Sequence, residues 1–428
     1  MAAPRRAWLV FGFSPEEAAG EPGPGPGPRR LESGPEGIRR VWPAWSYVVV
    51  ETGAGLEVRS AGLRRGLPGW AEALPSETHL VLRGAAAARA WPRAAALRGA
   101  LRDGPAWSRD LPPGPRRPPP LPLLPGGFAT PRPPFFAALP GGVRARGLAL
   151  GYEHVLVLGA AGETYAWGGG RHGQLGHGTL ESELQPRLVE ALAGVPMQAV
   201  AAGGWHSASV SEAGDLYVWG WNESGQLALP SKALAEERAQ DEDAGHAELT
   251  PRREQPAAED AAFISIQAFP ALLDLPQDLE VSKVSCGSRH TAVVTRGGEL
   301  YTWGWGKYGQ LGHEDNASSD QPCRVEYLAA EGLRAEEVVC GPWTTYVCVL
   351  EPQSPPPATA AYAEEDTGPT LPGEMGQAAP QDRIPPGLAT VNAGAAAGLV
   401  PDPAPAAATQ VLKPPREEPN MLITAAFP

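Results

Sequence analysis

The sequence predicts an all-β fold built from repeated strand pairs. Residues 201–210 and 216–220 read as two strands, and residues 212–215 between them have the composition of a tight turn. The same pattern recurs in register around His154, His206 and His290, with a glycine three residues before each histidine and another eight residues after it. Tyrosine, Trp-Gly and Gly-Gln-Leu then follow at fixed offsets. Since a lone hairpin cannot bury its apolar face, three copies in register indicate a repeat architecture.

The two ends of the repeat region complement each other. Residues 8–12 overlay the second half of the repeat, and residues 338–349 overlay its first half. Strands from both ends of the chain would complete one unit and close a ring, which removes exposed sheet edges. We therefore predict a β-propeller with six recognisable blades, whose reference positions are Ser46, Thr78, His154, His206, His290 and Thr344. The interval from 78 to 154 is wide enough for a seventh blade.

Residues 1–350 are predicted to form this single propeller, with clear repeats at 143–229 and 281–350 and degenerate repeats at 7–91. An Ala-rich, helix-prone stretch lies between Val81 and Trp91 in the degenerate part.

Four segments interrupt or follow the repeats and have the composition of loops or disorder. They are a Gly- and Pro-rich loop at 14–37, a Pro/Arg-rich insertion at 92–142, a disordered acidic loop at 230–262 and a disordered Pro/Ala-rich tail at 351–428. The insertion is expected to be partly ordered and has room for one further degenerate blade.

The charge is uneven along the chain. The formal net charge is −13, but residues 1–150 carry +9, which leaves −22 on the remainder. The overall sign argues against a general affinity for naked nucleic acid, and we expect no direct sequence-specific nucleic-acid binding. The four cysteines form no CxxC pair, and no apolar run approaches the length of a membrane span, so a soluble intracellular protein is expected.

No residue pattern predicts an enzyme, a metal site or a cofactor. The histidines at 154, 206 and 290 occupy equivalent places in different blades, where a ring would spread them apart, so each is expected to hydrogen-bond the neighbouring strand. The glycines at 168–170 are not followed by the Lys-Ser/Thr pair of a phosphate loop. The sequence therefore favours a non-catalytic binding protein.

The repeat resembles that of the regulator of chromosome condensation family. The resemblance rests on Gly-Gly-Trp-His-Ser at 203–207, Gly-Asp-Leu-Tyr-Val-Trp-Gly at 214–220 and the Gly-Gln-Leu that follows at 225–227. It is specific over about 143–350 and weak over 7–91. It implies a seven-bladed β-propeller, and the spacing of 52 residues between His154 and His206 agrees with the family's repeat length.

We expect no second domain beside the repeats, as in a small stand-alone member of that family. This resemblance implies a partner, a JmjC-domain oxygenase, and a nuclear, chromosome-associated role in histone lysine methylation and mitotic chromosome segregation, with histones or chromatin as possible further contacts. The tail from about 351 departs from the family pattern. The founding member implies an alternative function, guanine-nucleotide exchange on a small GTPase, but the inserted wedge on which that activity depends has no match here.

One linear feature stands out as a candidate modification or partner-binding site. Arg144 and Arg146 follow a Pro/Gly-rich segment and precede the strand that begins near Leu148. An accessible arginine pair can dock into an acidic pocket on a partner or in a modifying enzyme, and the oxygenase implied by the resemblance favours hydroxylation. Two solvated arginines at the start of a strand remain the alternative.

Overall fold

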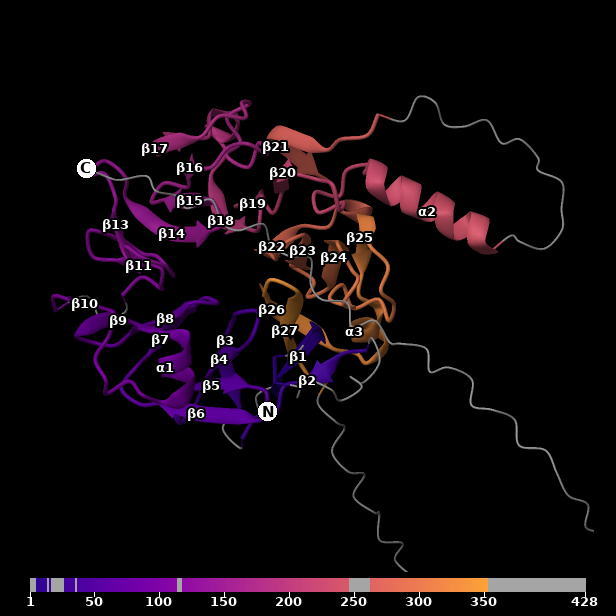
Figure 1. Ribbon diagram of the computed structural model, residues 1–428. Helices are drawn as coiled ribbons and strands as arrows, with labels where there is room; N and C mark the ends of the chain where they lie inside the picture. Colours follow the sequence, from indigo (N-terminus) through magenta and orange to yellow (C-terminus); the bar gives the residue numbers. More distant parts are fainter. Residues whose placement is uncertain are drawn as a thin grey trace, which may run out of the picture. The chain divides into compact units, whose positions relative to one another are not determined.

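Seven antiparallel sheets follow one another along the chain and make up a β-propeller. The computed structural model describes residues 5–13, 15–16, 27–34, 37–113, 118–245 and 262–352. Six of the sheets have four strands and one has three. Figure 1 shows the blades arranged around the ring, from the indigo sheet β3–β6 to the orange sheet β22–β25. The predicted all-β propeller is confirmed, with seven blades in place of the six that the repeats reveal.

The blades are numbered here from one to seven in chain order. The first three blades consist of β3 (Ile38–Pro43), β4 (Val48–Thr52), β5 (Gly55–Ser60) and β6 (Leu63–Leu67) in blade one; β7 (Glu72–Pro75), β8 (His79–Arg83), β9 (Ala87–Pro92) and β10 (Trp107–Asp110) in blade two; and β11 (Leu123–Leu124), β12 (Gly127–Ala129) and β13 (Phe136–Ala138) in blade three. The next three consist of β14 (Ala145–Leu150), β15 (His154–Gly159), β16 (Thr164–Gly168) and β17 (Glu183–Leu188) in blade four; β18 (Met197–Ala202), β19 (His206–Ser211), β20 (Leu216–Trp221) and β21 (Ile266–Leu273) in blade five; and β22 (Val281–Cys286), β23 (His290–Thr295), β24 (Leu300–Gly304) and β25 (Ser319–Arg324) in blade six. Blade seven consists of β26 (Arg334–Cys340), β27 (Thr344–Leu350), β1 (Arg6–Gly12) and β2 (Arg29–Arg30).

Short helices connect some of these strands. They are α1 (Arg93–Arg98), η1 (Glu190–Leu192), α2 (Lys232–Gly245), η2 (Pro276–Asp278) and α3 (Glu326–Ala330).

Blade seven closes the ring with strands from both ends of the chain. β1 pairs with β27 along its whole length, from Arg6 opposite Leu350 to Gly12 opposite Thr344. Figure 1 shows indigo β1 and β2 beside orange β26 and β27. The predicted closure is confirmed, and neither end blade is left with an unpaired half.

The insertion at 92–142 contains blade three, the blade that the repeats do not reveal. Its three short strands carry no copy of the repeat motif, yet their side chains continue the core on both sides. Leu124 and Phe135 pack with Val81 of blade two, and Phe128 packs with Trp167 of blade four. Apolar contacts between neighbouring blades, rather than the motif, therefore keep this blade in the ring.

Two local predictions were wrong. The helix-prone stretch between Val81 and Trp91 contains strand β9, and the helix α1 begins only after it, at Arg93. β9 pairs with β8 and with β10, so sheet hydrogen bonding overrides the helix propensity of alanine.

The acidic segment at 230–262, expected to be disordered, begins with helix α2. This helix contacts blade six, because Arg238 donates to Asp320 at 2.5 Å and Lys307 pairs with Glu237. Residues 246–261 and the predicted tail from 353 lie outside the described residues, as does most of the loop at 14–37.

The repeated motif residues join each blade to the next. The Gln226 carbonyl of blade five accepts hydrogen bonds from Thr291 and from the Trp303 indole of blade six, at 2.7 and 3.0 Å. Gln174 and Gln310 make the equivalent link to the following blade. The residues of the repeat signature therefore hydrogen-bond each blade to the next.

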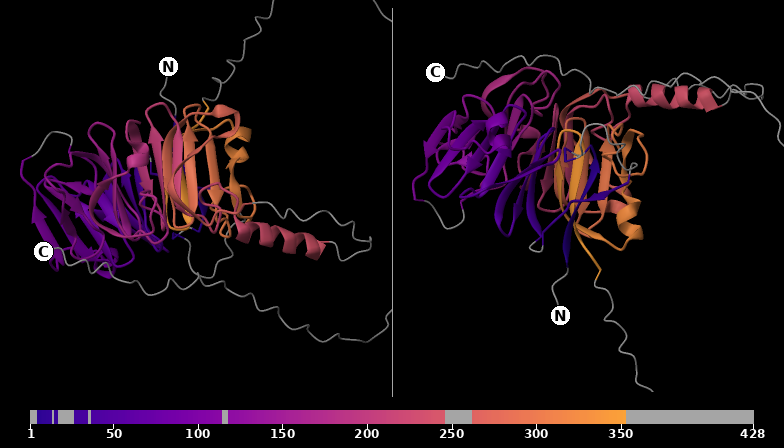
Figure 2. Two further views of the ribbon diagram at one scale, coloured as in Figure 1. Left: turned by 90° about the horizontal axis from the view of Figure 1, so that it is seen from above. Right: turned by 60° about the horizontal axis from the view of Figure 1, so that its bottom comes forward.

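The propeller has two faces, which the first strands of the blades define. We call them the strand-start face, where these strands begin, and the strand-end face, where they turn into the second strands. Backbone hydrogen bonds between blades show that the strands of neighbouring blades run in the same direction. Gly204 N–H donates to Gly287 O at the strand ends, and Val281 N–H donates to Gly214 O at the strand starts. The strands run between these faces in Figure 2.

Candidate partner-binding surfaces

Arg144 and Arg146 lie on the strand-start face, at the beginning of β14, and both are exposed. Arg144 forms no hydrogen bond or ion pair with any other described residue. Arg146 occupies the bulge between Ala145 and Gly147, and its guanidinium donates to the Met197 carbonyl of blade five. The two arginines therefore differ in role, because Arg146 helps to join two blades while Arg144 is available to a partner.

An open cavity of about 270 Å³ lies next to Arg144. Its lining is largely apolar and comes from blade three and the segment that leads into β14, including Leu123, Leu124, Leu139 and Val143. The three-stranded blade thus leaves an apolar recess whose lining includes Val143 and Ala145, the residues on either side of Arg144. A partner that places an apolar side chain next to a carboxylate would match this combination.

The three repeat histidines are buried inter-blade links. The Nε2 atoms of His154, His206 and His290 lie 2.9, 3.0 and 3.0 Å from hydroxyl oxygens of the next blade. Burial lowers their pKa values to about 3, 3 and 4. Each histidine is therefore neutral at physiological pH, and the predicted structural role is confirmed. In the described part of the chain, no three His, Cys, Asp or Glu side chains are grouped to hold a metal ion.

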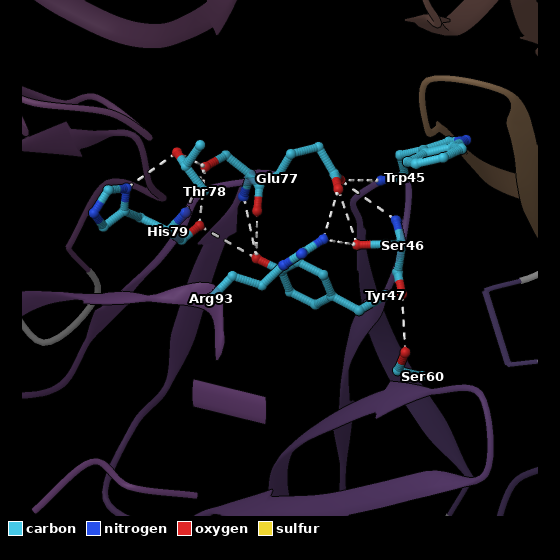
Figure 3. Close-up of polar contacts among 9 residues, drawn as sticks. Trp45, Ser46, Tyr47, Ser60, Glu77, Thr78, His79 and Arg93 are labelled. Carbon is cyan, nitrogen blue, oxygen red and sulfur yellow. Dashed lines mark hydrogen bonds and ion pairs between the residues drawn. The ribbon is translucent and has the colours of Figure 1, made fainter. Parts of the chain in front are cut away.

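Blades one and two replace this buried link with a charged one (Figure 3). The Glu77 carboxylate accepts hydrogen bonds from the Ser46 hydroxyl at 2.9 Å and the Trp45 amide at 2.8 Å. Arg93 donates to Ser46 at 2.7 Å and to Glu77 at 3.2 Å. Because every group in this cluster has a partner, it holds two degenerate blades together and leaves no group free for chemistry.

An aromatic cluster lies on the strand-end face over blades four to six. It consists of Tyr152, His172, Trp205 and Trp221, with the guanidinium of Arg289 beside them. The ring centroids of Tyr152 and Trp205 are 5.3 Å apart, and those of Trp205 and Trp221 are 5.4 Å apart at 88°. The Arg289 Cζ lies 4.6 Å from the Trp221 ring centroid. We call this set the strand-end cluster.

Comparison with known proteins agrees with this architecture. The family model described as the regulator of chromosome condensation (RCC1) repeat matches residues 161–210, 213–294 and 297–348. The chain is 48% identical over 369 residues to RCC1 domain-containing protein 1 of Homo sapiens, which covers 81% of this chain and 97% of the relative. It is 49% identical over 336 residues to the Mus musculus protein of that name, covering 73% of this chain and 88% of the relative. The chain belongs to the regulator of chromosome condensation repeat family.

Solved structures of this family share the fold. The crystal structure of Prp20p from Saccharomyces cerevisiae, described with its binding to Gsp1p and histones, matches with a TM-score of 0.59 over 82% of this chain and 92% of that one. The sequences are only 15% identical, so the match shows a common propeller and no more.

Sequence reasoning found Arg144 but missed the strand-end cluster as a surface. Trp205 belongs to the repeat motif, and Trp221 lies one residue beyond the repeated Trp-Gly pair. A tryptophan at that offset, which Trp305 repeats in blade six, is the signal in the sequence. In the described part of the chain no helix is long and apolar enough to cross a membrane.

Proposed function

We propose that the protein is a non-catalytic adaptor that binds a JmjC-domain oxygenase and supports chromatin regulation through histone lysine methylation and mitotic chromosome segregation. The oxygenase and the chromosomal setting come from the resemblance to a stand-alone family member, which the 48% identity over 97% of the human relative supports. A nuclear, chromosome-associated location is part of this proposal.

The observation that carries the proposal is Arg144, an exposed arginine with no hydrogen bond or ion pair to any described residue, whose neighbours Val143 and Ala145 line an apolar recess. Its side chain can leave the surface without breaking a hydrogen bond or ion pair to any described residue, which favours insertion into an active site. Arg146 would have to break its bond to Met197 first. Arg144 is therefore the preferred modification or contact site, and Arg146 the supporting one.

The test is affinity purification of the full chain from nuclear extract, followed by mass spectrometry of bound proteins and of the peptide that contains Arg144. Wild type, R144A and R146A are compared with R187A, an exposed arginine on β17 of the same blade. We expect R187A to recover the oxygenase as wild type does, and R144A to lose it together with any mass shift of 16 Da on that peptide. Undiminished oxygenase recovery by R144A, or no oxygenase with wild type, contradicts the proposal.

Guanine-nucleotide exchange is the second candidate. It is favoured by the fold shared with Prp20p, whose structure is described with Gsp1p binding. Release of a fluorescent nucleotide from a panel of small GTPases, with and without the full chain, tests it directly. Exchange activity of the full chain would replace the adaptor proposal, and unchanged release across the panel removes this candidate.

A further inference from the structure

The guanidinium of Arg289 is half-buried and forms no hydrogen bond or ion pair with any described residue. Its Cζ lies over the Trp221 ring, and no described carboxylate lies within ion-pair distance of it. Burial lowers the pKa of Arg289, and nearby Glu223 offsets this only in part. A partly desolvated cation of this kind gains stability from an anion that approaches it from solvent.

The position of Arg289 shows that the fold itself does not need a cation there. Trp45 and Trp343 stand at the same repeat position in blades one and seven, each immediately before the reference residue. Each packs on an aromatic ring of the preceding blade, since Phe13 stacks on Trp45 at 6.2 Å and Trp305 contacts Trp343 at 4.8 Å. An aromatic residue therefore satisfies the packing at this junction, and Arg289 adds a charge that packing does not require.

The surroundings limit what kind of anion can bind. Of the nearby carboxylates, Glu153 is held by Arg171 at 3.2 Å, while Glu223 is exposed and remains beside the site. A polyanion such as a nucleic-acid backbone would meet these negative charges, and the chain beyond residue 150 carries −22. A single carboxylate next to an apolar side chain fits better, because it can pair with Arg289 while its neighbour packs on the exposed Tyr152 and half-buried Trp205.

We propose that the strand-end cluster is a docking site for an acidic peptide segment of a partner protein, with a carboxylate on Arg289 and an adjacent apolar or aromatic side chain on Tyr152 and Trp205. This site lies on the opposite face from Arg144. It is therefore independent of the oxygenase proposal, and both surfaces are accessible at once.

The experiment is a selection of short bead-displayed peptides, with randomised positions around one Asp or Glu, against the full chain, followed by fluorescence anisotropy with the enriched peptide. The variants are R289Q and R289K, and the control is R296Q, an exposed arginine of the same blade on the other face, where it pairs with Glu280. Circular dichroism melting of each variant shows that the propeller is intact.

We expect aromatic residues to be enriched next to the fixed acid, and the dissociation constant to rise at least about tenfold in R289Q and less in R289K, with R296Q unchanged. Replacing the peptide carboxylate by an amide should cost the same factor. No enrichment, equal binding by R289Q and wild type, or a single-stranded oligonucleotide that competes through Arg289 more tightly than the peptide would each overturn the proposal.

Discussion

The buried histidines make the propeller sensitive to mild acid, and His206 gives the clearest measurement. Its Nε2 lies 3.0 Å from the Thr291 hydroxyl, whose own proton goes to the Gln226 carbonyl at 2.7 Å. The histidine therefore donates from Nε2, and its Nδ1 atom is bare and has no hydrogen-bond partner among the described residues. Burial disfavours the charged form, and His290 and His154 add to this, so the pKa of His206 is lowered to about 3.

This pKa sets the direction and size of the change in the free energy of unfolding with pH. The unfolded chain takes up a proton near pH 6.5, the ordinary value for histidine, while the folded chain does not do so until about pH 3. The unfolded state thus binds more protons between these values, so the free energy of unfolding falls as the pH falls. From pH 7 to pH 5 the loss is about 2 kcal/mol for each such histidine.

The assay is urea unfolding of wild type and H206Q at pH 7 and pH 5. Glutamine keeps a donor near Thr291 but does not titrate, so the difference between the two pH slopes isolates one group and cancels all others. We expect H206Q to be less stable at pH 7 and to lose about 2 kcal/mol less than wild type on going to pH 5. Equal pH slopes for the two proteins would refute the reasoning.

Two further predictions concern ring closure and blade packing. F11A should lower the free energy of unfolding by about 3–5 kcal/mol, because Phe11 is 0% exposed in the closing blade, whereas F13A, at a residue 42% exposed, should change it by less than about 1 kcal/mol in the same urea assay. A comparable loss for the two variants would contradict a buried closing strand. G204A should lower the free energy of unfolding by about 1–3 kcal/mol, because the added Cβ would lie 2.5 Å from the Ser288 carbonyl oxygen. G66A, where the added Cβ has nothing within 4 Å, serves as its control in thermal melting. Equal melting temperatures for the two variants would show that the backbone around Gly204 shifts without cost to remove the close contact.

Much of the fold was predictable because the repeat residues act locally and in pairs. The offset from His206 to Trp219 places the two residues near each other at the open end of one hairpin. From there His206 bonds to Thr291 of the following blade and Trp219 to Gln174 of the preceding one. Ring closure was predictable for the same reason, since residues 8–12 and 338–349 are complementary halves of one unit. For blade three only the room for a degenerate blade within 92–142 was predictable, because its short strands are held by apolar contacts such as those of Phe128, which leave no motif.

The candidate surfaces, like the fold, were only partly predictable from the sequence. Sequence alone indicated Arg144 and Arg146 as an accessible pair, but only the fold shows that Arg146 donates to Met197 while Arg144 has no described partner. The strand-end cluster joins residues 152 to 289, which no local pattern connects.

The sequence by itself determined the repeat, its strand pairing and the closure of the ring, because these depend on spacings within single blades. Only the tertiary structure decided which side chains meet on a face, because a face is assembled from several blades at once. The placement of the Arg289 guanidinium over Trp221 is the clearest example of a contact that only the fold reveals. Each residue alone fits its repeat position, and the site exists only where two blades join.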